Sequence, residues 1–197
     1  MFKISRFIFF SFLICLCPVL NFAQQNKSFR WSLGLQNVRT ADLVSFSAPV
    51  RSTTGERFRV VINPEKDCYC YIIAETPGGS DVGVFHAGHL KGGNVWYSPA
   101  MELTPPSGSE SLFIVVSLSE QKNITQRISA LNNNPASTQR RALINEIFRV
   151  RSDVSKFKEA PEIPVLMGGA TRGDPEKSQG VEFSGLETYV KTISIEH

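Results

Sequence analysis

Short apolar segments of strand length, separated by turn-forming residues, constrain the fold of this chain more than any other feature of its sequence. Between residues 55 and 118, the segments 58–62, 68–73 and 112–118 are rich in β-branched and aromatic residues, and Gly, Pro, Asn or Asp residues lie between them. Strands of an antiparallel sheet have this length and this punctuation. The stretch therefore predicts a β-rich domain, and it contains no reactive motif that identifies an activity.

Apolar and polar side chains alternate along three segments of the chain. A period of two places the apolar residues on one face of a strand and the polar residues on the other. It occurs in residues 29–36, in residues 57–62 with Arg57 and Arg59 on the polar face, and in residues 189–195. Each of these segments is expected to form a strand with one buried face.

The strand expected at residues 112–118 differs because it is apolar on both faces. A strand of this kind is usually covered on both sides, so we expect it to be the most buried strand of the domain. Residues 57–62 and 68–75 are separated by the turn-forming residues 63–67, which predicts that the two strands pair as a hairpin. A further turn is expected at residues 88–93.

The apolar spacing changes from strand-like to helical after residue 120. Two helices are predicted, and the sequence Asn-Asn-Asn-Pro at residues 132–135 separates them. Their apolar faces are expected to contain Ile124, Ile128 and Leu131 in the first helix, and Leu143, Ile144, Ile147 and Val154 in the second. The predicted fold is therefore mainly β: an antiparallel β-sandwich-like domain over residues 24–197, with a helical pair inserted at its edge near residues 120–158.

The first 23 residues have the organisation of a secretory signal peptide. Lys3 and Arg6 supply the positive start, residues 7–20 the apolar stretch, and Ala23 the small residue near the expected cut. Removal of residues 1–23 would leave an exported domain, either periplasmic or secreted. Two alternatives remain open at this point: an uncleaved membrane anchor, and lipid attachment through a cysteine of this segment, Cys15 or Cys17.

The charge of the chain argues against a nucleic-acid partner. The formal net charge of +3 falls to +1 when Lys3 and Arg6 are removed with the signal peptide. A domain so close to neutrality has no general attraction for polyanions. The Gly-rich segment 168–173 lacks the spacing of a phosphate-binding loop, which favours a tight connection between strands. We therefore expect no cofactor, and contact with a membrane only through an anchor or a lipid.

Two cysteines and two histidines form the only cluster that merits a test as a metal site. Cys68, Cys70, His86 and His89 supply two thiolates and two imidazoles, which is the donor set of a tetrahedral zinc site. Their spacing is unusual, and an oxidising compartment disfavours free thiolates. The preferred interpretation is that Cys68 and Cys70 are small core residues and that the chain has no metal site.

Four short motifs resemble the bacterial domain of unknown function 4384 family. They are Gly-Glu-Arg-Phe at 55–58, Cys-Tyr-Cys-Tyr-Ile at 68–72, Trp-Tyr-Ser-Pro at 96–99 and Gly-Ser-Glu at 108–110. The resemblance covers roughly residues 55–117, with an extension toward the C-terminus left open. It implies a β-sandwich-like accessory domain of exported or envelope proteins, and it supplies no catalytic residues.

The favoured functional prediction is a non-catalytic binding module of the cell envelope or the secreted fraction. It would contact a protein or glycan partner through its loops and a sheet edge, with Trp96 and Tyr97 as candidate contact residues. The alternative is a small hydrolase or zinc-binding protein that uses His86, His89 and the cysteine pair. No Gly-x-Ser-x-Gly motif supports the hydrolase, although a catalytic triad can assemble from distant positions.

Overall fold

The computed structural model describes residues 30–155, 163–166, 179–184 and 187–197. The signal peptide predicted at residues 1–23 and the Gly-rich segment 168–173 lie outside these residues, as does Phe29.

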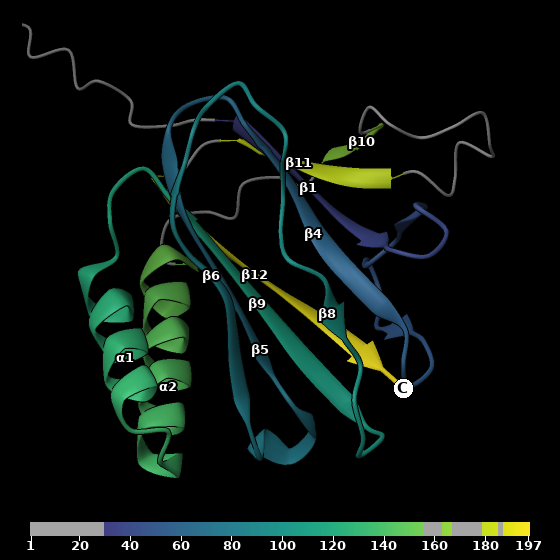
Figure 1. Ribbon diagram of the computed structural model, residues 1–197. Coiled ribbons are helices and arrows are strands. Elements are labelled where there is room, and N and C mark those ends of the chain that lie inside the picture. The colour runs from purple at the N-terminus through teal and green to yellow at the C-terminus, as the bar shows by residue number, and fades with distance from the viewer. Residues whose placement is uncertain (1–29, 156–162, 167–178, 185–186) are drawn as a thin grey trace, which may run out of the picture.

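The domain has three layers, two β-sheets and a pair of helices (Figure 1). Sheet A has seven strands, in the order β10 (Ile163–Leu166), β11 (Gln179–Ser184), β1 (Arg30–Asn37), β4 (Arg57–Pro64) and β7 (Trp96–Tyr97), with β2 (Leu43–Val44) beside β1 and β8 (Met101–Glu102) beside β4. Sheet B has five strands, in the order β3 (Val50–Arg51), β12 (Thr188–Glu196), β9 (Ser109–Ser117), β5 (Cys68–Glu75) and β6 (Val82–Leu90). The helices are α1 (Lys122–Asn133) and α2 (Ser137–Ser155), and a 3-10 turn occupies Pro77–Gly79. The prediction of a mainly β, sandwich-like fold with a helical pair is confirmed.

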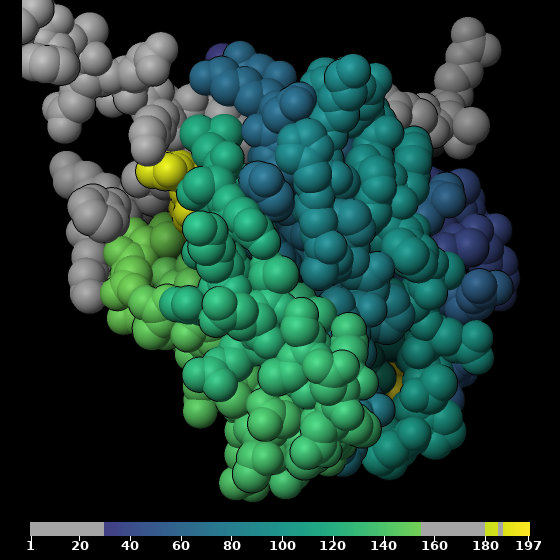
Figure 2. All heavy atoms as spheres, turned by 60° about the vertical axis from the view of Figure 1, so that its left-hand side comes forward, coloured from purple at the N-terminus to yellow at the C-terminus, as the bar shows by residue number. Residues whose placement is uncertain are grey.

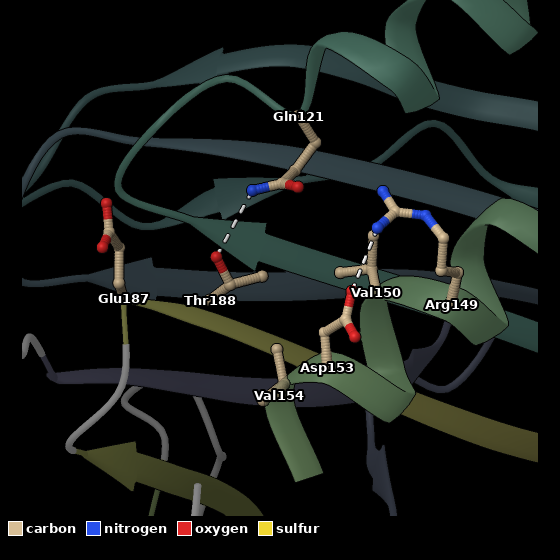
Figure 3. A pocket seen from close by; sticks show the side chains of 7 residues that line it. All are labelled: Gln121, Arg149, Val150, Asp153, Val154, Glu187 and Thr188. Carbon is tan, nitrogen blue, oxygen red and sulfur yellow. Dashed lines mark hydrogen bonds and ion pairs between the residues drawn. The ribbon is translucent and has the colours of Figure 1, made fainter. Parts of the chain in front are cut away.

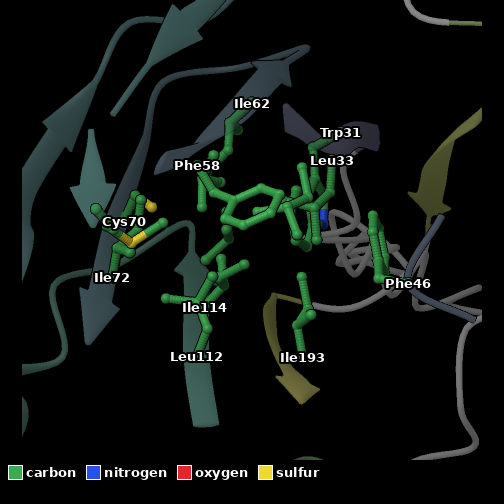
Figure 4. Close-up of a cluster of buried hydrophobic side chains, with 14 of the residues drawn as sticks. Trp31, Leu33, Phe46, Phe58, Ile62, Cys70, Ile72, Leu112, Ile114 and Ile193 are labelled. Carbon is green, nitrogen blue, oxygen red and sulfur yellow. The ribbon is translucent and has the colours of Figure 1, made fainter. Parts of the chain in front are cut away.

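The core between the two sheets follows from the alternation of the strands. The odd-numbered residues of β1 point inward, and so do the even-numbered residues of β4. The inward side chains of the two strands therefore lie side by side: Trp31, Leu33 and Leu35 on β1, and Phe58, Val60 and Ile62 on β4. Sheet B contributes the facing side chains, among them Cys70, Ile72, Leu112, Ile114 and Ile193 (Figure 4). Burial of this many large apolar side chains from both sheets is the principal driving force for closing the sandwich.

The outer face of sheet B has its own apolar core, because β5 and β9 are apolar on both sides. The side chains Tyr71, Ile73, Phe113 and Val115 point away from sheet A. They pack against the apolar faces of the helices, which contain Ile124, Ile128, Leu131, Leu143, Ile144, Ile147 and Val150. The helices therefore cover a face of the sandwich (Figure 2). Their predicted position at the edge is wrong, since the second apolar face of sheet B requires a cover of this size.

The predicted hairpin of residues 57–62 and 68–75 is also wrong. Strand β4 pairs with β1, β7 and β8 in sheet A, whereas β5 lies between β9 and β6 in sheet B. The chain thus crosses from one sheet to the other near Glu65. The turn residues do permit a reversal there, but β5 needs a two-sided central position because both of its faces are apolar. The turn predicted at residues 88–93 begins later, since β6 continues to Leu90.

No helix within the described part of the chain is long and apolar enough to cross a membrane.

Candidate functional site

The two aromatic residues predicted as contacts lie on opposite faces of sheet A. Trp96 is paired with Ile62 and Tyr97 with Val61 in the register of β7 and β4. Since Ile62 points into the core, Trp96 also points inward, and its ring centroid lies 4.4 Å from that of His86. Tyr97 points outward and is 45% exposed. Trp96 therefore seals the gap between the two sheets, and Tyr97 is the member of the pair that is available to a partner.

Strand β7 is held in this position by local contacts that the sequence encodes. The Ser98 backbone N–H donates to the Val60 carbonyl at 2.9 Å, and the Ser98 hydroxyl accepts from the Val60 N–H at 2.9 Å. The loop before β7 passes close to Lys66 at Gly92, where a Cβ atom would lie 2.4 Å from the Lys66 carbonyl carbon. Only glycine fits this approach, so Gly92 and Ser98 fix the register that brings Tyr97 beside β4.

Arg59 on β4 lies directly over Tyr97. Its guanidinium carbon is 4.6 Å from the centroid of the Tyr97 ring, within the range of a cation–π interaction. Its Nε donates a hydrogen bond of 2.7 Å to the Gln36 side-chain oxygen. These two contacts fix the plane of the guanidinium group. No described residue accepts a hydrogen bond from its Nη atoms, so the outer edge of the Arg59 fork is open to a ligand.

We refer to the five residues Gln36, Arg59, Val61, Val95 and Tyr97 as the Tyr97 surface. Val95 is 46% exposed, whereas Val61 is buried beneath its neighbours. The surface lies on the face of sheet A that points away from sheet B and the helices. An exposed valine and tyrosine beside an oriented arginine combine apolar area with a charged group, which is the composition of many contact surfaces.

The four residues that were considered as an alternative zinc site do not converge. His86 lies on the inner face of β6, the same side as Cys68 and Cys70 of the neighbouring strand β5, because it is paired with the inward-pointing Ile72. His89 is paired with Tyr69 and points to the opposite face, 3.6 Å from the Asp67 carboxylate. In the part of the chain that the structure describes, no three His, Cys, Asp or Glu side chains are close enough to hold a metal ion.

Burial also makes the two thiols poor metal ligands and poor nucleophiles. Both cysteines are free and buried. Desolvation, with a smaller contribution from Asp67, raises the pKa of Cys68 to about 11, and desolvation raises the pKa of Cys70 well above its ordinary value. Burial lowers the pKa of His86, which favours the neutral imidazole. Thiolates, the form that binds zinc and reacts with electrophiles, are therefore disfavoured at neutral pH.

Native Cys68 and Cys70 are expected to resist a thiol reagent such as Ellman's reagent at pH 8. Unfolding in urea should expose both thiols, so that the reagent releases two equivalents of its coloured product per chain. The measurement requires a chain in which Cys15 and Cys17 are replaced by serine, so that only this pair reacts. Rapid reaction of either thiol in the folded protein would contradict the burial of the pair in the inter-sheet core.

A chain of three polar side chains, which the sequence did not predict, closes one end of the sandwich. The Thr54 hydroxyl lies 3.1 Å from His197 Nδ1, and His197 Nε2 lies 3.2 Å from a Glu110 carboxylate oxygen. Hydroxyl, imidazole and carboxylate stand in the order of a catalytic triad. However, the His197 side chain is 0% exposed. A triad imidazole must pass a proton to the leaving group of a substrate, so this enclosure favours a stabilising role. We call these three residues the His197 cluster.

The cavity between α2 and the start of β12 has a volume of about 400 Å³ and mixed walls (Figure 3). Its polar groups bind one another. Arg149 is paired with Glu146 and Asp153, and the Gln121 amide donates to the hydroxyl groups of Ser117 and Thr188. Because these donors are already satisfied inside the protein, the cavity offers a ligand few polar contacts.

Two of the arginines of α2, Arg140 and Arg149, are also paired with carboxylates. Arg140 lies 3.7 Å from Asp81, and Arg149 binds two carboxylates of its own helix. This pairing agrees with the interpretation of a solvated helix face and gives no support to a phosphate site.

Sequence reasoning identified Tyr97 but missed the residues that surround it. The alternation in residues 57–62 indicated that Arg59 lies on a polar face, yet the pairing that brings it to Tyr97 is not encoded locally. His197 carried no signal of its own. Comparison of the chain with protein-family models, with curated proteins and with solved structures found no match.

Proposed function

We propose that this chain is an exported, non-catalytic domain that binds a protein partner through the Tyr97 surface. The observation that carries the proposal is the pairing of an exposed tyrosine with an arginine held in a fixed orientation. Tyrosine and arginine are the residue types that contribute most often to the binding energy of protein interfaces, in part because rigid side chains lose little entropy on binding. The signal-like segment at residues 1–23 supports export.

The arrangement of the layers supports the choice of this face. Both faces of sheet B are occupied, one by sheet A and the other by the helices. The solvent-facing side of sheet A lacks a helical cover among the described residues, and its edge strand β7 has only two residues. A partner can therefore reach the sheet face and its edge together. The Tyr97 surface lies where the two meet.

Substitution of Tyr97 by serine should remove most partner capture from envelope or culture extracts of the source cells. The truncation deletes the exposed ring and the support for the Arg59 guanidinium while leaving the core in place. The measurement is affinity purification with tagged wild-type and variant chains, followed by quantitative mass spectrometry. Phe148, on α2, is similarly exposed at 46% and provides the matched control Phe148→Ser.

A partner that co-purifies equally with the wild type and Tyr97→Ser, but is lost with Phe148→Ser, would place the contact on the helices and contradict the proposal. Failure of any protein to enrich with the wild type over a tag-only control would also count against it.

A further inference from the structure

We infer that the Tyr97 surface recognises the carboxylate groups of an acidic protein segment, with Arg59 as the receptor for one carboxylate. This inference rests on the proposed function and assigns the chemistry of its partner. An arginine fork binds a carboxylate through two parallel N–H···O bonds, which adds directional specificity to the charge attraction. Such a pair requires a fork with a fixed plane and free terminal nitrogens, and Arg59 meets both conditions.

The contacts that Arg59 makes with described residues leave its binding edge unoccupied. The Tyr97 ring lies beneath the guanidinium plane, and the Gln36 oxygen takes the proton of Nε. Within the described residues, neither contact involves the two Nη atoms, which carry the remaining four N–H donors. Because the plane is already oriented in the free protein, binding a carboxylate loses less side-chain entropy than it would with a mobile surface arginine.

The charges around Arg59 favour an anionic partner. Arg57 lies two residues earlier on the same face of β4, and neither arginine forms an ion pair with a described carboxylate. Elsewhere on the neighbouring surface the arginines are neutralised: Arg30 lies 3.6 Å from Glu182, and Arg39 lies 2.8 Å from Glu56. Within the described residues, two arginines without an ion pair therefore stand in a row along the strand, and Glu102 lies opposite the first of them, Arg57.

The same surface favours a protein segment over a polyanionic chain. The exposed side chains of Val95 and Tyr97 offer apolar contact beside the two arginines, which suits a peptide that carries both acidic and apolar residues. Glu102 is opposite Arg57 in the register of β4 and β8, and Glu182 is at the other end of the face. A continuous row of phosphates or uronates offers no apolar group to Val95 and Tyr97, and it cannot space its charges to avoid Glu102, so the surface disfavours nucleic acid and acidic glycan.

The test uses protein purified from cells that express the full chain, and a synthetic peptide of alternating glutamate and leucine as the probe. Binding is measured by isothermal titration at several salt concentrations. We expect Arg59→Gln to weaken binding about tenfold or more, as removal of a charge-assisted hydrogen-bonded pair does. Arg59→Lys should give an intermediate loss, since it keeps the charge without the fork. The matched control is Arg141→Gln, an exposed arginine on α2, which should leave binding unchanged.

Three outcomes would overturn the inference. The first is equal binding by the wild type and Arg59→Gln, with both shown to be folded by circular dichroism. The second is equal affinity for a probe in which glutamine replaces glutamate. The third is stronger binding of polygalacturonate than of the peptide. If extract capture depends on Tyr97 but is unaffected by Arg59→Gln and by salt, the proposed function stands and only the carboxylate assignment fails.

Discussion

Replacement of Phe113 by alanine is expected to lower the free energy of unfolding by about 3–5 kcal/mol. The Phe113 side chain is 2% exposed and packs in the core between sheet B and the helices, with its ring centroid 5.6 Å from that of Phe148. Ile114, the next residue of β9, points the opposite way into the inter-sheet core and is 0% exposed. Ile114→Ala should cost about 2–5 kcal/mol, because it also leaves a cavity. Urea unfolding followed by circular dichroism measures both losses.

The substitutions Phe113→Ala and Ile114→Ala together test the three-layer architecture directly. In a two-layer sandwich with helices at its edge, one of two successive residues on a strand would face solvent and its truncation would cost little. The matched control is Phe148→Ala, which removes the same ring from a position that is 46% exposed and should cost less than about 1 kcal/mol. A small loss for either Phe113→Ala or Ile114→Ala would contradict the assignment of β9 as a strand covered on both faces.

The faces of individual strands could be predicted because the pleat fixes them locally. Alternation in residues 29–36 and 57–62 placed Trp31 and Phe58 on apolar faces, and both are core residues. The two-sided apolar pattern of residues 112–118 correctly identified the most enclosed strand. The pairing of strands depends instead on contacts between distant residues. For this reason the expected β4–β5 hairpin was wrong, although both strands were assigned correctly.

The candidate site shows the same division between local and distant information. Adjacent residues in a strand point to opposite faces, so Trp96 and Tyr97 had to lie on opposite faces of the sheet. The sequence did not indicate which of the two would be buried. That choice depends on β7 pairing with β4, which also brings Arg59 to the Tyr97 ring. The His197 cluster is more remote still, since 143 positions separate Thr54 from His197. No local pattern relates the two residues.

Removal of the His197 imidazole is expected to destabilise the protein by about 1–3 kcal/mol near neutral pH, the usual penalty for leaving a buried polar group without its partner. In the wild type, His197 Nε2 lies 3.2 Å from Glu110, and the two side chains are 0% and 11% exposed. In His197→Ala the Glu110 carboxylate loses this partner. The matched control is His89→Ala, since the His89 side chain is 49% exposed and its ion pair with Asp67 is worth less than about 1 kcal/mol.

The pH dependence of this loss follows from the titration of Glu110. Burial raises the pKa of Glu110 above its ordinary value of 4.5, and the charge and hydrogen bond of His197 act in the opposite direction. A carboxyl group whose pKa is higher in the folded than in the unfolded state contributes stability at low pH. This stability is fully present below pH 4.5, the ordinary pKa, and is lost as the pH rises through the pKa of the folded state. Without His197 the pKa of Glu110 rises further. The destabilisation caused by His197→Ala should therefore be largest at neutral pH and shrink as the protein is acidified.

A double-mutant cycle separates this charge effect from the loss of packing. Glu110→Gln in the His197→Ala background removes the unpaired charge while keeping the shape of the side chain, so it should restore part of the lost stability at neutral pH. In the wild-type background His197 offsets part of the cost of burying the Glu110 charge, so the same substitution should have a smaller stabilising effect or none. The effect of Glu110→Gln thus depends on the residue at position 197, which simple cavity formation at His197 cannot produce. Urea unfolding of the four proteins at pH 7.5 and at acidic pH measures the cycle. The loss for His197→Ala could instead be independent of pH and remain when Glu110→Gln is added. That result would mean that the Glu110 charge does not contribute to the effect of His197 and that the cluster stabilises the domain by packing alone.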